Sequence, residues 1–312
     1  MIKAIIFDLD GTLCNTVEDI RTGVNAMLTR LGYKTRSRAD ILKFINNGAR
    51  ALVTRSLPKD VQDVEFIVDT ALDVYQNEYA KCYCEFTEPY RGIEYMVSEL
   101  KIKGYKIAVL SNKQDVFVKN ICDKLFGKKA FSFIMGNTSD FPPKPDPTSY
   151  EYVSKMLGVK PNLTVYVGDS DVDVKTAQNA GAEFIGCDWG YRGEDVLREM
   201  GASRIAMTPD DIITEIAKIE DKLEAARLEK KLAKKAKKPK AEKKKSAPEA
   251  DKEASNEPKE TAEAEAITEE SDGKDTVCAD STPTEKNAED VAINDSENGK
   301  EKESNEQENE KK

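Results

Sequence analysis

The sequence of 312 residues contains no histidine. This absence excludes a Ser-His-Asp triad, a Cys-His dyad, a zinc site with histidine ligands and a haem with a proximal histidine. Acid–base chemistry must therefore use carboxylates, lysine, tyrosine or cysteine. A divalent metal bound by side chains of this chain would lie among oxygen atoms, which favours Mg²⁺, Ca²⁺ or Mn²⁺.

Long hydrophobic runs are also missing: no window approaches the roughly 18 apolar residues of a membrane span. The chain begins Met-Ile-Lys-Ala-Ile-Ile-Phe, and Asp8 follows directly. This apolar stretch is too short for the apolar region of a secretory signal. The six cysteines form no Cys-x-x-Cys pair, and this predicts reduced, partly buried thiols. We therefore expect a soluble cytoplasmic protein.

Aromatic residues are absent after Tyr191. Residues 227–245 carry 11 basic and 2 acidic side chains, whereas residues 249–312 carry 8 basic and 22 acidic ones. Such a composition buries too little apolar area to offset its ordering entropy, so it predicts a disordered charged tail over 221–312 after an initial helix. The basic run could contact nucleic acid. Because it lacks aromatic residues for base stacking and the acidic segment can neutralise it, a solvated tail is favoured.

Six short apolar runs predict strands buried on both faces of a parallel sheet. They span residues 3–7, 106–110, 131–134, 163–167, 183–185 and 204–206. Helical patterns alternate with them at 92–103, 115–126, 147–157, 172–180 and 194–200. This alternation predicts an α/β fold with a doubly wound, Rossmann-like parallel sheet.

One interval interrupts the alternation with helical patterns alone, at 17–31, 38–45, 49–57 and 60–80. We interpret it as an inserted α-helical cap domain. The expected organisation is an α/β catalytic core over 1–14 and 89–220, a helical cap over 15–88 and the charged tail. The tail begins with helix-start features at Thr208-Pro209-Asp210-Asp211, and isoleucines at helical spacing follow.

Acidic residues follow two of the predicted strands. Asp8 and Asp10 follow the first strand, and Asp169, Asp171 and Asp173 follow the strand at 163–167. Ligand sites of open α/β sheets lie at the carboxyl ends of strands. Two carboxylates about 4 Å apart repel by on the order of 4 kcal/mol at an effective dielectric near 20, and a divalent cation would relieve this repulsion.

Two further loops carry groups suited to phosphoryl oxygens. Ser111 and Asn112 follow the strand at 106–110, and Lys144 lies in the sequence Pro142-Pro143-Lys144-Pro145. A hydroxyl and an ammonium can both contact a phosphoryl group, and the flanking prolines stiffen the loop of Lys144.

Together these motifs resemble those of the haloacid dehalogenase superfamily, specifically its phosphatases with a helical cap after the first motif. Asp-x-Asp-Gly-Thr at 8–12, Ser-Asn at 111–112, Lys144 and Gly-Asp-Ser-x-x-Asp at 168–173 occur in the family's order. The resemblance covers about residues 1–220. Within the superfamily, the chain looks most like phosphoglycolate phosphatases. That likeness rests on Asn-Gly-Ala-Arg-Ala-Leu at 47–52, Ser-Asn-Lys at 111–113 and Lys-Pro-Asp-Pro at 144–147.

The resemblance implies a Mg²⁺-dependent phosphomonoester hydrolase acting on phosphoglycolate or a similar small phosphorylated metabolite. Asp8 would attack phosphorus to form an aspartyl-phosphate, and Asp10 would act as acid and base. Ser111, Asn112 and Lys144 would bind the phosphate. Mg²⁺ would bind Asp8, the backbone carbonyl of Asp10 and Asp169, with Asp173 as a weaker direct or water-mediated ligand.

Arg50 in the cap is a candidate to hold the substrate carboxylate. The alternative is a surface arginine paired with an acidic residue of the cap.

Other functions share this scaffold. They are a pyrophosphatase, a sugar-phosphate phosphatase or β-phosphoglucomutase-like enzyme, and a phosphonate hydrolase with a cap lysine as Schiff base. The resemblance implies that Asp10 favours phosphoryl transfer over carbon–halogen cleavage, because the dehalogenases of the superfamily lack this second acid. It also implies that Ser170 disfavours a mutase, which would carry an acid at that position. A non-catalytic binding or scaffold protein that works through its charged tail is the alternative outside the enzymes.

Overall fold

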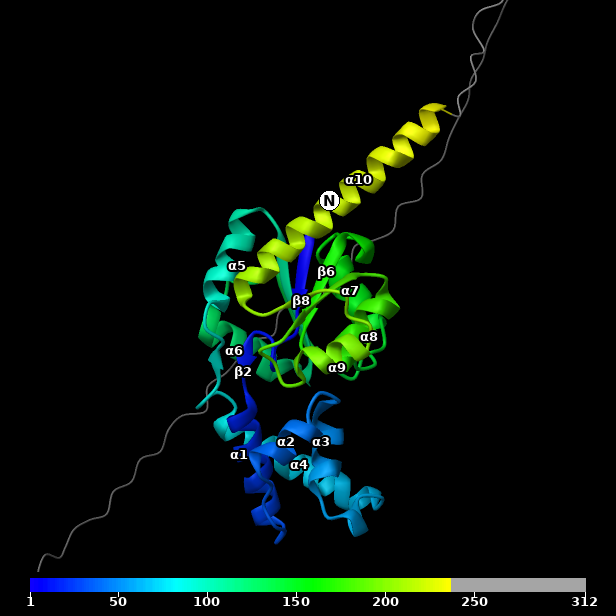
Figure 1. Cartoon of the computed structure of the whole chain (residues 1–312). Helices are drawn as coiled ribbons and strands as arrows, with labels where there is room; N and C mark the ends of the chain where they lie inside the picture. Colours follow the sequence, from blue (N-terminus) through cyan, green and yellow to red (C-terminus); the bar gives the residue numbers. More distant parts are fainter. Residues whose placement is uncertain (237–312) are drawn as a thin grey trace, which may run out of the picture. The chain divides into compact units, whose positions relative to one another are not determined.

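The computed structural model describes residues 1–236, with side chains to residue 233 (Figure 1). The predicted disordered tail, Cys278 and the end of the basic run lie outside the described residues. Within the described part, no helix is both long and apolar enough to cross a membrane. The five cysteines found there are free and buried, as predicted for reduced thiols.

The central sheet has six strands in the order β5-β4-β1-β6-β7-β8, and every neighbouring pair is parallel. The strands are β1 (Ala4–Phe7), β4 (Lys106–Gln114), β5 (Phe133–Asn137), β6 (Thr164–Gly168), β7 (Glu183–Cys187) and β8 (Ile205–Ala206). This is the sheet predicted from the apolar runs. One run was misplaced: β5 begins at Phe133, because Phe131 packs into the core ahead of the strand.

Helices cover both faces of this sheet, so the doubly wound α/β prediction is confirmed. Ile5 and Phe7 of β1 pack with α5 (Ile93–Ile102), α6 (Asp115–Phe126) and α10 (Pro209–Ala236). Ala4 and Ile6 point to the opposite face. There they pack with α7 (Thr148–Met156), α8 (Asp171–Ala180) and α9 (Gly193–Glu199). A short 3₁₀ turn, η2 (Pro161–Leu163), leads into β6.

The initial helix predicted for the tail is α10. Its apolar positions Ile212, Ile216 and Ile219 are at most 1 % exposed and pack on the sheet. Asp210 and Asp211 lie in its first turn, where their negative charges stabilise the helix by interacting with the positive end of its dipole.

Between β1 and α5 the chain forms a helical insertion. It contains α1 (Val17–Arg30), α2 (Arg38–Phe44), α3 (Gly48–Ser56), a 3₁₀ turn η1 (Lys59–Val61) and α4 (Glu65–Cys82). These helices bury an apolar cluster of their own. The predicted helix over 60–80 begins later, at Glu65, because η1 starts after Pro58 and the backbone is extended at Val64.

Two short antiparallel strands join the insertion to the rest of the chain. Cys14 and Asn15 form β2, which pairs with Glu88 and Pro89 of β3. Next to this ribbon, the buried carboxylate of Asp19 accepts hydrogen bonds from the backbone N–H groups of Phe86 and Thr87. Both ends of the insertion are thereby fixed. The division of the chain into a core and a cap at 14/15 and 88/89 stays a prediction.

Candidate active site

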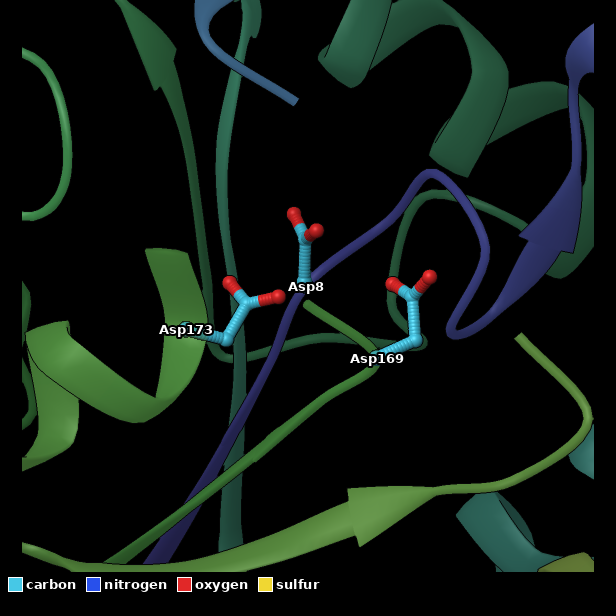
Figure 2. A group of neighbouring side chains, drawn as sticks. All are labelled: Asp8, Asp169 and Asp173. Atoms are coloured by element: carbon cyan, nitrogen blue, oxygen red, sulfur yellow. The ribbon is translucent and has the colours of Figure 1, made fainter. Parts of the chain in front are cut away.

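Three carboxylates meet at the carboxyl edge of the sheet (Figure 2). Asp8 follows β1, Asp169 follows β6, and Asp173 lies in the first turn of α8. One oxygen of each lies within 4.8 Å of the others, and all three side chains are buried. β1 and β6 are neighbours in register, with Phe7 beside Val167, so the sheet itself brings Asp8 and Asp169 together.

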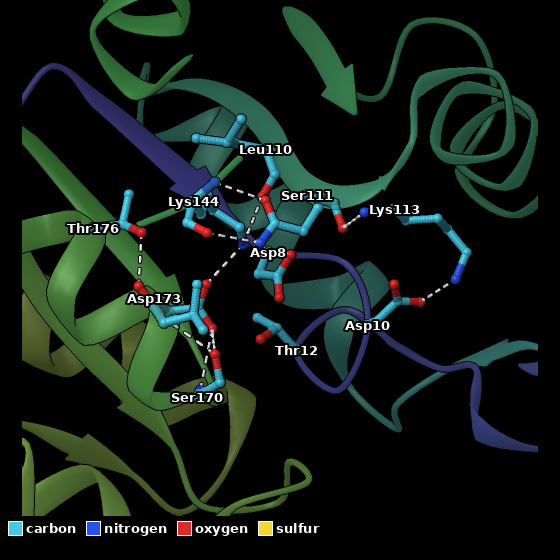
Figure 3. Close-up of polar contacts among 12 residues, drawn as sticks. Asp8, Asp10, Thr12, Leu110, Ser111, Lys113, Lys144, Ser170, Asp173 and Thr176 are labelled. Atoms are coloured by element: carbon cyan, nitrogen blue, oxygen red, sulfur yellow. Dashed lines mark hydrogen bonds and ion pairs between the residues drawn. The ribbon is translucent and has the colours of Figure 1, made fainter. Parts of the chain in front are cut away.

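The Lys144 ammonium contacts two of these carboxylates, those of Asp8 and Asp173 (Figure 3). Its Nζ atom is 3.0 Å from Oδ1 of Asp8 and 2.8 Å from Oδ1 of Asp173, and its side chain is 2 % exposed. Burial lowers the pKa of Lys144, but the carboxylates of Asp173 and Asp8 raise it more, so the pKa lies above its usual value. Lys144 is therefore a permanent buried cation.

The buried acids have shifted pKa values. Burial raises the pKa of Asp8 from 3.8 to about 7, against the opposing charge of Lys144 and with a further rise from Asp173 and Asp10. Burial and the neighbouring acids also raise the pKa of Asp169 well above its usual value. Among the described residues, Lys144 pairs with Asp8 and Asp173, and no lysine or arginine pairs with Asp169, so a second cation could bind beside these carboxylates.

Asp173 differs from the other two acids because each of its oxygens accepts two hydrogen bonds. Oδ1 accepts from Lys144 and from the Tyr166 hydroxyl at 3.0 Å, and Oδ2 accepts from the hydroxyl of Ser170 at 2.6 Å and from its backbone N–H at 3.1 Å. Ser170 and Asp173 form the capping box of α8. This arrangement holds Asp173 against Lys144.

Asp10 is not part of this acidic group, and its side chain lies apart from those of Asp8 and Asp173 (Figure 3). Its Oδ1 atom accepts from Nζ of Lys113 at 2.7 Å and from the Thr16 hydroxyl at 2.5 Å. Asp10 and Asp8 both line a pocket between the sheet edge and the insertion. The side chains of Asp8 and Asp10 therefore open onto one cavity but have different partners.

Ser111 and Asn112 line the same pocket and are buried. Asn112 makes three hydrogen bonds: Oδ1 accepts from the backbone N–H of Lys144, and Nδ2 donates to the carbonyls of Lys144 and Asn46. These bonds fix the loop of Lys144 and join it to the insertion. Ser111 Oγ accepts only a 3.3 Å bond from the backbone of Lys113 among the described residues.

The structure does not bring Arg50 into this group. Its guanidinium is 2.5 Å from Asp69 and 3.9 Å from Glu65, both on α4, and its side chain is 52 % exposed. Arg50 is absent from the described residues that line the pocket. Asp171, at the start of α8, is likewise outside the acidic cluster.

Several residues around Asp169 were missed by the sequence analysis. Thr12 donates its hydroxyl to Oδ1 of Asp169 at 3.0 Å, and the backbone N–H of Tyr191 donates to Oδ2 at 2.7 Å. At Gly190, an added Cβ would lie 2.1 Å from Cβ of Asp169. Thr12 belongs to the first motif and could have been singled out, whereas no local pattern marks Gly190 or Tyr191.

Arg192 was also missed. Its guanidinium donates to the carbonyls of Leu42 and Ile45, at the end of α2. The loop that contacts Asp169 through Tyr191 thus also contacts the insertion.

Comparisons with known proteins agree with this site. A sequence profile described as haloacid dehalogenase-like hydrolase matches residues 5–187. A phosphoglycolate phosphatase of Pseudomonas syringae pathovar tomato is 33 % identical over 214 residues, which are 67 % of this chain and 77 % of that protein. A phosphoglycolate phosphatase of Aquifex aeolicus is 34 % identical over 189 residues, covering 61 % of this chain and 86 % of that protein.

The fold has solved counterparts. The crystal structure of a predicted phosphoglycolate phosphatase from Haemophilus somnus superposes with a TM-score of 0.64 at 26 % sequence identity. The match covers 69 % of this chain and 98 % of that one. The chain therefore belongs to the haloacid dehalogenase-like hydrolases, and within them it is a phosphatase that resembles phosphoglycolate phosphatases.

Proposed function

We propose that the protein is a Mg²⁺-dependent phosphomonoester hydrolase that acts through an aspartyl-phosphate on Asp8, with phosphoglycolate or a similar small ester as substrate. The observation that carries this proposal is the position of Asp8 on the pocket, beside Asp169 and in contact with the Lys144 ammonium. A nucleophilic carboxylate needs positive charge around the phosphoryl group that it attacks, and this cluster can supply it.

The donor set fits Mg²⁺. Asp8 and Asp169 offer carboxylate oxygens, the ligands that this hard cation prefers. Burial and neighbouring acids raise the pKa of both, because the charged carboxylates are unfavourable there without a cation. Together with the backbone carbonyl of Asp10, they would hold the ion. Because each oxygen of Asp173 already accepts two hydrogen bonds, and Oδ1 accepts one of them from the Lys144 ammonium, we propose that Asp173 positions Lys144 and contacts the ion only through water. A bound Mg²⁺ supplies charge neutralisation and orients the phosphoryl oxygens.

In the first step, an oxygen of Asp8 forms a bond to phosphorus while the bond from phosphorus to the ester oxygen breaks. Asp10 donates its proton to the departing oxygen, which leaves as an alcohol. In the second step, Asp10 takes a proton from water as this water attacks the aspartyl-phosphate. Inorganic phosphate leaves, and the Asp8 carboxylate and the Asp10 proton are restored.

Three further residues support these steps. Lys144 and the Ser111 hydroxyl contact the phosphoryl oxygens in the proposed complex, because both side chains line the pocket beside Asp8. Asn112 acts as a positioning residue, since its side chain binds the backbone of Lys144. The carboxylate-binding role of Arg50 stays a prediction from the sequence and has no part in this mechanism.

The phosphonate hydrolase alternative finds less support. It requires a lysine of the insertion at the pocket. None of the described residues that line the pocket from the insertion is a lysine; they are Ile20, Ile45, Asn46, Gly48, Ala49, Leu52, Tyr75 and Tyr79.

A substrate panel tests the proposal. Phosphate release is measured from phosphoglycolate, pyrophosphate, glucose 1-phosphate and phosphonoacetaldehyde, with Mg²⁺ or with EDTA. We expect Mg²⁺-dependent release that is fastest from phosphoglycolate. If phosphate is released fastest from another compound, that compound is the preferred substrate in place of phosphoglycolate. Release that persists in EDTA would contradict the metal dependence. No release from any compound would contradict the hydrolase and favour the binding or scaffold alternative.

The cellular setting follows from the same features. The five free buried cysteines of the described part are typical of a reducing compartment, and we propose a cytoplasmic enzyme with a small phosphorylated metabolite as its partner.

A further inference from the structure

Lys113 is a buried cation on the insertion side of the pocket. It follows Ser111 and Asn112 near the end of β4, and its side chain is 7 % exposed. Its Nζ atom lies 2.7 Å from Oδ1 of Asp10 (Figure 3). The same atom lies 5.2 Å from the centre of the Tyr79 ring. An ammonium has three N–H donors, and Asp10 takes one of them. Lys113 therefore keeps donors for another acceptor.

The pocket walls around Lys113 strengthen its attraction for an anion. Among the described residues that line this pocket, Lys113 and Lys144 are the only cations, and Lys144 is held by Asp8 and Asp173. The insertion contributes mainly apolar and aromatic side chains, such as Leu52 and Tyr75. In such surroundings the effective dielectric is low, and a charge pair is stronger than at the surface.

Asn46 offers a second donor at the same pocket. Its Nδ2 atom is buried and has no hydrogen-bond partner in the described part of the chain. A buried donor without a partner carries an energetic cost, which an oxygen acceptor in the pocket would remove. Lys113 and Asn46 thus provide a cationic and a neutral donor at the same pocket.

Because Lys113 lies beside Asp10, it lies close to the part of the substrate that Asp10 would protonate. A group that protonates the ester oxygen must lie within hydrogen-bond reach of it, about 2.6–3.2 Å. In phosphoglycolate a single methylene separates that oxygen from the carboxylate. The carboxylate must therefore lie next to Asp10, where Lys113 has free donors.

We propose that Lys113 binds the carboxylate of the leaving group and so selects small carboxylated phosphate esters. This inference rests on the proposed function, because it takes Asp10 as the group next to the ester oxygen. It gives the selecting role to a residue of β4 instead of Arg50, whose guanidinium is paired with Asp69 outside the pocket.

Kinetics with matched substrates test the proposal. Phosphoglycolate is compared with 2-hydroxyethyl phosphate, in which an alcohol replaces the carboxylate. The ratio of their kcat/KM values cancels any common effect on Asp10. We expect the ratio to fall at least tenfold in Lys113→Met and to be largely kept in Lys113→Arg. Lys119→Met is the control, since it removes an exposed ammonium paired with Asp115 on α6. Equal losses on both substrates in Lys113→Met would overturn the proposal, as would a selective loss in Arg50→Ala alone.

A binding measurement covers the case in which Lys113→Met is inactive. Calorimetry with Mg²⁺ present compares 3-phosphonopropionate, a non-hydrolysable analogue of phosphoglycolate, with 3-hydroxypropylphosphonate. We expect the wild type to bind the carboxylate analogue at least tenfold more tightly and Lys113→Met to lose this preference. Equal affinities in the wild type would overturn the carboxylate site. If the wild type keeps the Lys113-dependent preference but hydrolyses no ester, the proposed reaction fails and the carboxylate site stands.

Discussion

The ammonium of Lys144 lies 3.0 Å from Oδ1 of Asp8, and both side chains are almost completely buried. The same ammonium contacts Asp173 at 2.8 Å. Among the described residues, Lys144 is thus the only cation that pairs with Asp8 and Asp173, and its removal leaves these buried carboxylates without a cationic partner.

We therefore expect Lys144→Met to destabilise the metal-free protein by about 3–5 kcal/mol, the usual cost of breaking a buried ion pair. Chemical denaturation in EDTA measures this difference. Lys119→Met, which breaks an exposed pair with Asp115, should cost less than about 1 kcal/mol. Adding Asp8→Asn to Lys144→Met should recover part of the loss; a double variant that is less stable than Lys144→Met would contradict this account.

The raised pKa of Asp8 makes stability depend on pH. The folded protein holds a proton on this carboxyl up to about pH 7, whereas the unfolded chain releases it near pH 4. The stability that this group contributes is therefore complete below about pH 4 and is lost as the pH rises through 7. In thermal unfolding, the Tm of the metal-free wild type should fall between pH 5 and pH 8, and the Tm of Asp8→Asn should fall less.

Mg²⁺ should reverse this loss, because the ion competes with the proton for the same oxygens. At 100 times its Kd a ligand of the folded state stabilises by about 2.7 kcal/mol. The gain in Tm on adding Mg²⁺ should accordingly be larger at pH 8 than at pH 5. An equal gain at both pH values, or an equal gain in Asp8→Asn, would show that Mg²⁺ binds elsewhere.

Gly11 combines a backbone requirement with a steric one. Its φ angle is +86°, and an added Cβ would lie 2.4 Å from Oδ2 of Asp169. Gly104 also has a φ angle of +86° but has no atom within 4 Å of an added Cβ. Alanine at either position costs roughly 1–2 kcal/mol from the left-handed backbone.

Only Gly11→Ala should also displace Asp169. We expect it to weaken Mg²⁺ binding and to lower kcat at least tenfold, while Gly104→Ala keeps both near the wild-type values. Titration of activity against Mg²⁺ concentration distinguishes the two variants. Equal behaviour of Gly11→Ala and Gly104→Ala would mean that backbone strain alone explains the effect.

The fold was predictable wherever a pattern repeats along the chain. The strand runs and the isoleucines of α10 are local signals of burial, and the structure agrees with them. The pairing of β2 with β3 was not predictable, because two-residue strands have no period and their partners are more than 70 residues apart. The late start of α4 at Glu65 depends on a turn that hydrophobic spacing does not reveal.

The acidic cluster was also predictable, because its residues lie in short motifs at the ends of strands. Asp8, Asp169 and Lys144 belong to motifs at strand ends and loops, and the sheet brings such ends together. For Arg50 the sequence left two interpretations open, and the structure agrees with the one that pairs it with an acidic residue of the insertion. The partner of Lys113 was not predictable. Arg50 has acids within reach on α4, whereas Lys113 reaches Asp10 across 103 positions of sequence. Only the packing of the insertion on the sheet edge decides which cation enters the pocket.

The central claim is that Asp8 carries the phosphoryl group during turnover. The most direct measurement is acid quenching of the enzyme during hydrolysis of phosphoglycolate with Mg²⁺, followed by borohydride reduction and peptide mass spectrometry. Reduction converts an aspartyl-phosphate to homoserine. We predict homoserine at position 8 in the wild type and none in Asp8→Asn, which should also release no phosphate. Turnover without modification at position 8, or modification of another residue, would contradict the account.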